Sequence, residues 1–136
     1  METLSNAKHN DILKAFFNEI KEMNQYSVTR EDVIRNVMSK GAPRFYVTPE
    51  KARRYISILN RGGDTKLTNP HKIAMYNEIY RRYKLYIQEH NIKGYGIIDD
   101  ILCDILCEPA PSFYISVRTV KDIIYTSYKK RKCRLS

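Results

Sequence analysis

The chain has 136 residues and a formal charge of +9, from 24 basic and 15 acidic side chains. Its hydrophobic content of 43% is enough for a core and argues against global disorder. No stretch approaches the ~20 apolar residues of a membrane span, and the polar first ten residues lack a signal-peptide run. The three cysteines lack the spacing of a disulfide framework. We therefore expect a soluble, cytoplasmic protein without a membrane partner.

Six helices are predicted from the spacing of apolar residues and from capping signals. They are expected, in chain order, near residues 10–23, 30–40, 49–60, 70–89, 97–107 and 117–130. Thr29 and Thr48 are placed to cap the second and third helices, and Pro49 suits a first helical position. The run Lys93-Gly94-Tyr95-Gly96 is expected to interrupt the helical pattern. The predicted fold class is all-α.

Two stretches of the chain repeat one another, since residues 31–60 align with residues 99–128 without a gap. Only six of the 30 aligned positions are identical, yet the apolar positions of repeat 1 from Val33 to Ile56 are all kept in repeat 2. This pattern predicts a tandem duplication of a three-helix, helix-turn-helix-like unit, with both copies sharing one core. The expected division is 1–61 for repeat 1, 62–68 for a linker, 69–128 for repeat 2 and 129–136 for a basic tail.

Residues 115–124 resemble the turn and recognition helix of helix-turn-helix proteins, and residues 47–56 have the same register in repeat 1. Basic side chains off the buried stripe of such a helix can meet phosphates, and arginine can reach a guanine edge. The connector of roughly eight residues is longer than the three or four of an ordinary helix-turn-helix. Solvated helix faces or protein contacts are the alternative interpretation.

The basic charge is concentrated at residues 129–136, which carry five positive charges and no acid. Such a run indicates a polyanionic partner, nucleic acid ahead of a membrane surface or an acidic protein, or else a solubilising terminus. The candidate nucleic-acid-binding residues are Lys51, Arg53, Arg54, Arg118, Lys121, Lys129, Lys130, Arg131, Lys132 and Arg134.

Aromatic residues offer a second candidate surface, as stacking platforms for exposed bases. Both repeats keep a Phe-Tyr pair, at residues 45–46 and 113–114, while the preceding residue changes. We therefore predict that these pairs pack in the core, with the tyrosine hydroxyls at its rim or hydrogen-bonded. Tyr76, Tyr80 and Tyr83 are predicted to be buried between the repeats, although basic neighbours leave base stacking open.

Cys103 and Cys107 share one face of a predicted helix, but zinc would require two further ligands. Their counterparts in repeat 1, Arg35 and Ser39, lie off the inferred core, so we expect both cysteines to lie off it too. No nucleophile–base pair, phosphate-binding glycine loop or paired-carboxylate spacing is evident. We expect no metal, no cofactor and no catalytic residue.

The two Ala-Pro-x-Phe-Tyr-(Val/Ile)-(Thr/Ser) segments, within residues 42–56 and 110–124, resemble short basic proteins of gut Bacteroidota and their crAss-like tailed phages. That family has no established activity, so the resemblance implies a phage or mobile-element setting, a virion location included, and no site residues. Our leading hypothesis is a non-enzymatic nucleic-acid-binding protein whose partner is duplex DNA. The alternative is a phage virion structural or adaptor protein that binds other proteins through its helical repeats. Homo-oligomerisation stays open.

Overall fold

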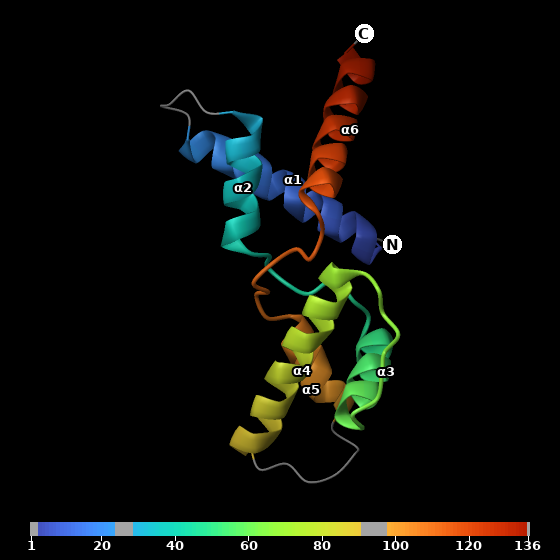
Figure 1. Ribbon diagram of the computed structural model, residues 1–136. Helices are drawn as coiled ribbons and strands as arrows, with labels where there is room; N and C mark the ends of the chain where they lie inside the picture. Colours follow the sequence, from blue (N-terminus) through green and yellow to red (C-terminus); the bar gives the residue numbers. More distant parts are fainter. Residues whose placement is uncertain (1–2, 24–28, 91–97, 136) are drawn as a thin grey trace. The chain divides into compact units, whose positions relative to one another are not determined.

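The computed structural model describes residues 3–23, 29–90 and 98–135. These residues form six α-helices and no strand (Figure 1). The helices are α1 (Leu4–Glu22), α2 (Arg30–Lys40), α3 (Pro49–Asn60), α4 (Pro70–His90), α5 (Ile98–Leu106) and α6 (Val117–Leu135). The predicted all-α class is confirmed. The predicted interruption at residues 93–96 lies outside the described residues.

The helix starts follow the local capping chemistry. The Thr29 hydroxyl accepts a hydrogen bond from the Asp32 amide at 3.2 Å, and the Asp32 carboxylate accepts one from the Thr29 amide at 3.3 Å. This reciprocal capping box satisfies two amides that have no partner inside α2. Thr48 likewise caps α3 by accepting from the Lys51 amide at 3.3 Å, ahead of Pro49 at the first helical position.

Two helix ends differ from the predicted ones by more than one residue. The helix α1 begins at Leu4 rather than near residue 10, because the Thr3 hydroxyl caps it by accepting from the Asn6 amide at 3.1 Å. The helix α6 continues to Leu135, so the basic residues expected in a separate tail belong to its last turns. Lysine and arginine are good helix formers, which allows the helix to run through a basic segment.

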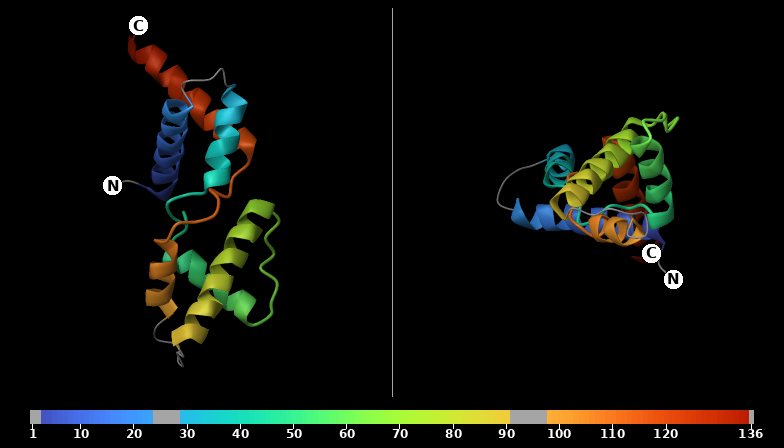
Figure 2. Two further views of the ribbon diagram at one scale, coloured as in Figure 1. Left: turned by 90° about the vertical axis from the view of Figure 1, so that its left-hand side faces the viewer. Right: turned by 90° about the horizontal axis from the view of Figure 1, so that it is seen from below.

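The chain divides into two compact units that do not coincide with the sequence repeats. The first unit comprises residues 1–42 and 111–136 and contains α1, α2 and α6. The second unit comprises residues 43–110 and contains α3, α4 and α5. Helices of the same unit lie together in Figure 1 and in the left view of Figure 2.

Each unit therefore takes its third helix from the other sequence repeat. The helices α1 and α2 of repeat 1 pack with α6 of repeat 2, and α4 and α5 of repeat 2 pack with α3 of repeat 1. Both crossings occur within an Ala-Pro pair, between Ala42 and Pro43 and between Ala110 and Pro111. The predicted grouping of three consecutive helices is not the grouping found in the structure.

The core of the first unit lies between α1, α2 and α6. Its buried apolar side chains are Ile12, Phe16, Val33, Ile34, Val37, Ala42, Phe113, Val120 and Ile124. At its edge, the ring of Phe17 on α1 packs edge-on against Tyr128 on α6, with centroids 6.0 Å apart. The Glu19 carboxylate, also buried, accepts a hydrogen bond from the Lys40 ammonium, which ties α1 to the end of α2.

The core of the second unit lies between α3, α4 and α5. Its buried apolar side chains are Phe45, Val47, Ala52, Ile56, Met75, Tyr76, Ile79, Tyr83, Ile101, Leu102, Ile105, Leu106 and Ala110. The Phe45 amide donates a hydrogen bond to the Leu106 carbonyl at 3.1 Å, so the connector before α3 is attached to the end of α5.

The Phe-Tyr pairs belong to the cores, as predicted. Phe45 is 1% exposed in the second unit and Phe113 is 3% exposed in the first. Tyr46 and Tyr114 are half-buried, at the rim. Each phenylalanine anchors its connector to the unit that holds the following helix, which excludes it from stacking on a ligand.

Candidate nucleic-acid interface

Three candidate residues lie on the exposed side of α3 in the second unit. Lys51, Arg53 and Arg54 are exposed, whereas Ala52 and Ile56 of the same helix are buried. The Arg53 guanidinium pairs with the Asp99 carboxylate at the start of α5, 3.2 Å away. The Arg54 guanidinium lies 5.1 Å from the centroid of the Tyr55 ring. This face is basic, but one of its three charges is neutralised locally.

The first unit carries a second set of candidates along α6. Arg118, Lys121 and Lys129 are exposed on the side away from buried Val120 and Ile124. The Lys121 ammonium pairs with the Glu31 carboxylate of α2 at 3.5 Å. Both side chains are about half exposed, so the pair contributes little stability and a phosphate can compete with it.

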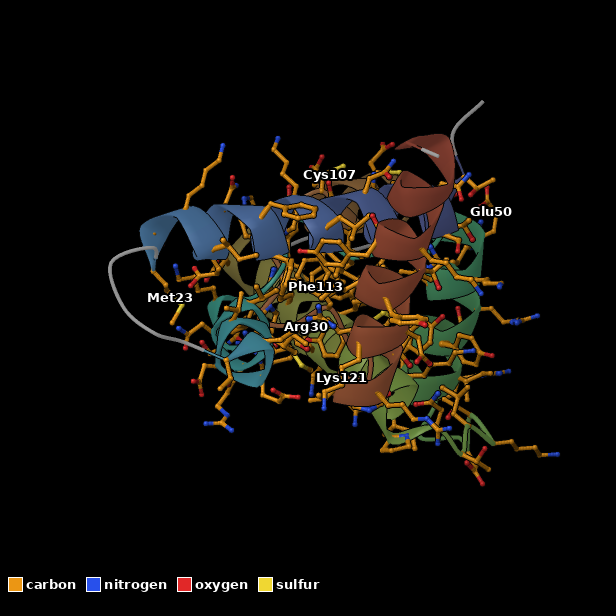
Figure 3. All side chains as sticks on the ribbon, turned by 90° about the horizontal axis from the view of Figure 1, so that it is seen from above. Met23, Arg30, Glu50, Cys107, Phe113 and Lys121 are labelled. Carbon is orange, nitrogen blue, oxygen red and sulfur yellow. The ribbon has the colours of Figure 1, made fainter. Side chains whose placement is uncertain are left out.

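Figure 3 shows Lys121 where α6 approaches α2, next to Arg30. The Arg30 guanidinium lies 5.4 Å from the centroid of the Tyr128 ring, which links α2 to α6 a second time. Within the described residues, no acidic group lies within ion-pair distance of Arg118 or Lys129. Their charges are therefore not neutralised by the surrounding structure.

The remaining candidates, Lys130, Arg131, Lys132 and Arg134, occupy the last turns of α6. The helix as a whole contains seven basic residues and one acid, Asp122. At 1.5 Å per residue its 19 residues extend roughly 28 Å. Both side views show its C-terminal end projecting past α1 and α2 of the same unit (Figures 1 and 2). Two-thirds of the formal charge of the chain, +6 of +9, thus lies on one helix.

The helix-turn-helix expectation does not match the grouping of the helices. It pairs α2 with α3 and α5 with α6, and the members of each pair belong to different units. The cause is the connector, whose buried phenylalanine leads the chain into the other unit. The candidates on α3 and those on α6 are consequently two separate sets, one in each unit.

The tyrosines of α4 have a structural role. Tyr76 and Tyr83 are buried, and the ring of Tyr76 packs against that of Tyr55 on α3, with centroids 4.4 Å apart. The half-buried Tyr80 hydroxyl donates to the Asn60 side-chain oxygen at 3.4 Å. The contacts of Tyr76 and Tyr80 join α4 to α3, a helix of the other sequence repeat. The predicted burial is confirmed for Tyr76 and Tyr83 but not for Tyr80. Burial raises the pKa of Tyr76 to about 12, so this phenol stays neutral at physiological pH.

Arg82, a basic neighbour of the α4 tyrosines, has contacts inside the second unit. Its guanidinium donates to the Pro109 carbonyl at 2.9 Å, pairs with Glu108 at 3.4 Å and covers the Phe45 ring at 5.0 Å. It thereby holds the second connector against the core of the second unit. A periodicity argument cannot find such a role, because the partners are distant in sequence.

Cys103 and Cys107 are exposed, as expected from their counterparts in repeat 1. In residues 3–23, 29–90 and 98–135, no three potential metal ligands come together. No helix within these ranges combines the length and the apolar character required to cross a membrane.

Comparisons with protein-family models, with curated proteins and with solved structures found no match to this chain.

Proposed function

We propose that this chain is a non-enzymatic nucleic-acid-binding protein and that α6 is its principal contact surface. The observation that carries the proposal is the concentration of seven basic residues and one acid on a helix whose end projects from its unit. A phosphate backbone is a dense line of negative charge, and a rigid basic helix can neutralise several phosphates in a row. Each neutralised phosphate releases condensed counterions, which provides the binding free energy.

The exposed cations of α3 form a second, weaker basic surface in this proposal. Lys51, Arg53 and Arg54 are exposed there, and a phosphate can compete with the exposed pair of Arg53 and Asp99 as it can with that of Lys121 and Glu31. The two surfaces differ in charge and in neighbours, so we propose that α6 dominates the affinity.

The repeated sequence and the grouping of the helices also suggest how the fold evolved. We infer that the chain arose by tandem duplication of a three-helix unit, and that the copies exchanged their third helices. The support is the gapless alignment of residues 31–60 with 99–128, together with the equivalent positions of the two crossings. Exchange of an identical element between copies is a low-cost rearrangement, because each helix meets the same kind of partner as before.

The test is the salt dependence of binding, measured by fluorescence anisotropy on labelled oligonucleotides. For the roughly six to ten phosphates that α6 and its surroundings can neutralise, affinity should fall about a thousandfold or more between 50 and 200 mM salt. Replacing Lys129, Lys130 and Lys132 by glutamine keeps helix propensity and removes three charges. This variant should bind unrelated sequences more weakly by a similar factor, with a smaller salt slope, since phosphate contacts carry no sequence information.

The matched control removes the same net charge from exposed lysines elsewhere, with Lys14, Lys21 and Lys72 replaced by glutamine. If this control weakens binding as much as the α6 variant, net charge alone attracts the nucleic acid and the assignment of α6 is wrong. The adaptor alternative predicts defined oligomers that persist after nuclease treatment, which light scattering detects.

A further inference from the structure

The most exposed of the large apolar side chains in the described ranges is Tyr125 on α6, at 63%. The preceding residue, Ile124, is completely buried, so the helix turns Tyr125 away from the core of the first unit. Packing in the core of the first unit therefore does not explain why an aromatic side chain occupies this position. Exposed aromatic side chains with a polar tip are characteristic of binding surfaces, where they supply large contact area at low entropic cost.

The neighbours of Tyr125 on the helix surface are basic. Lys121 and Lys129 lie four residues before and four residues after it, and residues at this spacing are adjacent on one face. Arg118, seven residues before, lies on the same side, and all three cations are exposed. The acidic groups nearby are Asp122 on α6 and Glu31 on α2, which pairs with Lys121.

The equivalent helix of repeat 1 lacks the aromatic residue. In the gapless alignment Tyr125 corresponds to Ser57, which is exposed on α3 between Arg53 and Arg61 at the same spacing. The two helices thus share a pair of flanking cations and differ in the residue between them. The aromatic side chain is a specific property of α6 and is not imposed by the repeated fold.

We propose that Tyr125 is a stacking platform for an unpaired base, with Lys121 and Lys129 neutralising the adjacent phosphates. Alternation of cations and an exposed aromatic ring matches the two features of a single strand, its charged backbone and its accessible base faces. A duplex conceals those faces inside its stack, so a ring on the protein surface gains little from it. This inference rests on the proposed nucleic-acid binding and specifies its preferred form as single-stranded.

The chain contains no tryptophan, so Tyr125→Trp introduces a single indole reporter at the proposed platform. Titration with a thymidine oligonucleotide of about 12 nucleotides, within the length that small single-strand sites cover, should quench its emission. A duplex of the same length should quench it less. The control is Leu85→Trp on α4, which is 41% exposed and lies between Arg81 and Glu89 rather than between two cations. Its emission should not change.

Affinity provides the second readout in the otherwise unchanged chain. Tyr125→Ser reproduces the residue of α3 and should weaken binding of the single strand about 5- to 160-fold, the range that corresponds to loss of one base–aromatic stack. Tyr125→Phe keeps the ring and should retain affinity. Duplex binding should be nearly the same for all three proteins.

The outcomes separate this inference from the proposed function. If the unmodified protein binds neither form of nucleic acid, the proposed function fails and the stacking role fails with it. If binding is salt-sensitive but Tyr125→Ser leaves it unchanged, or lowers single-strand and duplex affinity equally, only the stacking role is overturned. Equal quenching of both tryptophan variants also overturns it. Light scattering gives a further outcome that would overturn the stacking role. If the unmodified protein forms an oligomer without nucleic acid and Tyr125→Ser dissociates it, the ring binds another protein molecule and not a base.

Discussion

The phenol ring of Tyr76 lies against that of Tyr55 where α4 meets α3, and only 4% of the Tyr76 residue is exposed. Burial disfavours the charged phenolate, and this is the main reason why its pKa rises from 10.0 to about 12. The unfolded chain therefore loses this proton at a lower pH than the folded protein. Between pH 10 and 12 the unfolded state binds fewer protons, so stability decreases as pH rises.

From this difference we predict that the free energy of unfolding falls by about 1 kcal/mol by pH 11 through Tyr76 alone. Urea unfolding at pH 8.5 and pH 11 measures the change, and Tyr76→Phe removes the ionisable group while keeping the ring. The contribution of Tyr76 is the part of the decrease that is absent from Tyr76→Phe. Identical decreases in both proteins would mean that Tyr76 ionises as readily folded as unfolded.

For individual residues, sequence patterns predicted the buried phenylalanines and the exposed cysteines, but they did not predict that Tyr125 is exposed. It follows Ile123 and Ile124, and within such an apolar run periodicity does not show which member faces outward. The aligned residue of repeat 1, Ser57, carried the missing signal, because a polar counterpart at an equivalent position indicates an exposed site.

Among the secondary-structure elements, the helix positions could be predicted closely where caps and apolar spacing agree. For α2 and α3 the predicted ranges coincide with the observed ones. For α1 they do not, because residues 4–9 are mostly polar and give no periodic signal, although Thr3 caps them. At the end of α6, basic composition alone predicts a separate tail, but lysine and arginine have high helix propensity and the helix continues to Leu135.

The two connectors provide a test of how the elements are grouped. Phe45→Ala should remove packing from the second unit and Phe113→Ala from the first, each at a cost of about 3–5 kcal/mol, as for other buried phenylalanines. Amide hydrogen exchange should then show lost protection mainly in α3, α4 and α5 for Phe45→Ala, and mainly in α1, α2 and α6 for Phe113→Ala.

The exposed-site control for this experiment is Leu85→Ala, which should change stability by less than about 0.5 kcal/mol. If Phe45→Ala instead lowers protection in α1, α2 and α3 together, the three helices of repeat 1 form one folding unit and the exchanged grouping is wrong.

For the molecule as a whole, the grouping of α6 with α1 and α2, and of α3 with α4 and α5, could not be read from the sequence. Ala52 and Ile56 of α3 correspond to Val120 and Ile124 of α6, so both helices present similar apolar faces. Judged by these apolar faces alone, α3 and α6 could each pack either with α1 and α2 or with α4 and α5. The connectors decide the outcome through tertiary contacts, such as the hydrogen bond from the Phe45 amide to the Leu106 carbonyl, that no local pattern contains.

Each unit contains helices from both sides of the linker, and this grouping predicts that the two halves of the chain stay associated after the linker is cut. Residues 61–64 are exposed, and Gly62 has a φ of 73°, a conformation that glycine adopts without strain at the end of α3. A protease site inserted between Gly62 and Gly63 would yield two fragments, each contributing helices to both units. After cleavage without denaturant, the fragments should co-elute in size-exclusion chromatography and separate only when urea unfolds them.

Uncut protein with the same insertion is the control for changes in elution. Two fragments that separate in buffer and each keep the circular dichroism of a folded helical domain would contradict the exchanged arrangement.

The split of the first unit has a consequence for the order in which the protein folds during its synthesis. The second unit is one continuous segment and can close once residue 110 has left the ribosome, whereas α1 and α2 must wait for α6. Residue 124 follows residue 42 by 82 residues, which takes roughly 4–16 s at 5–20 residues per second. Throughout that interval α1 and α2 lack α6, the helix with which both pack in the native state. The helices α1 and α2 are thus synthesised before the second unit but complete their packing after it.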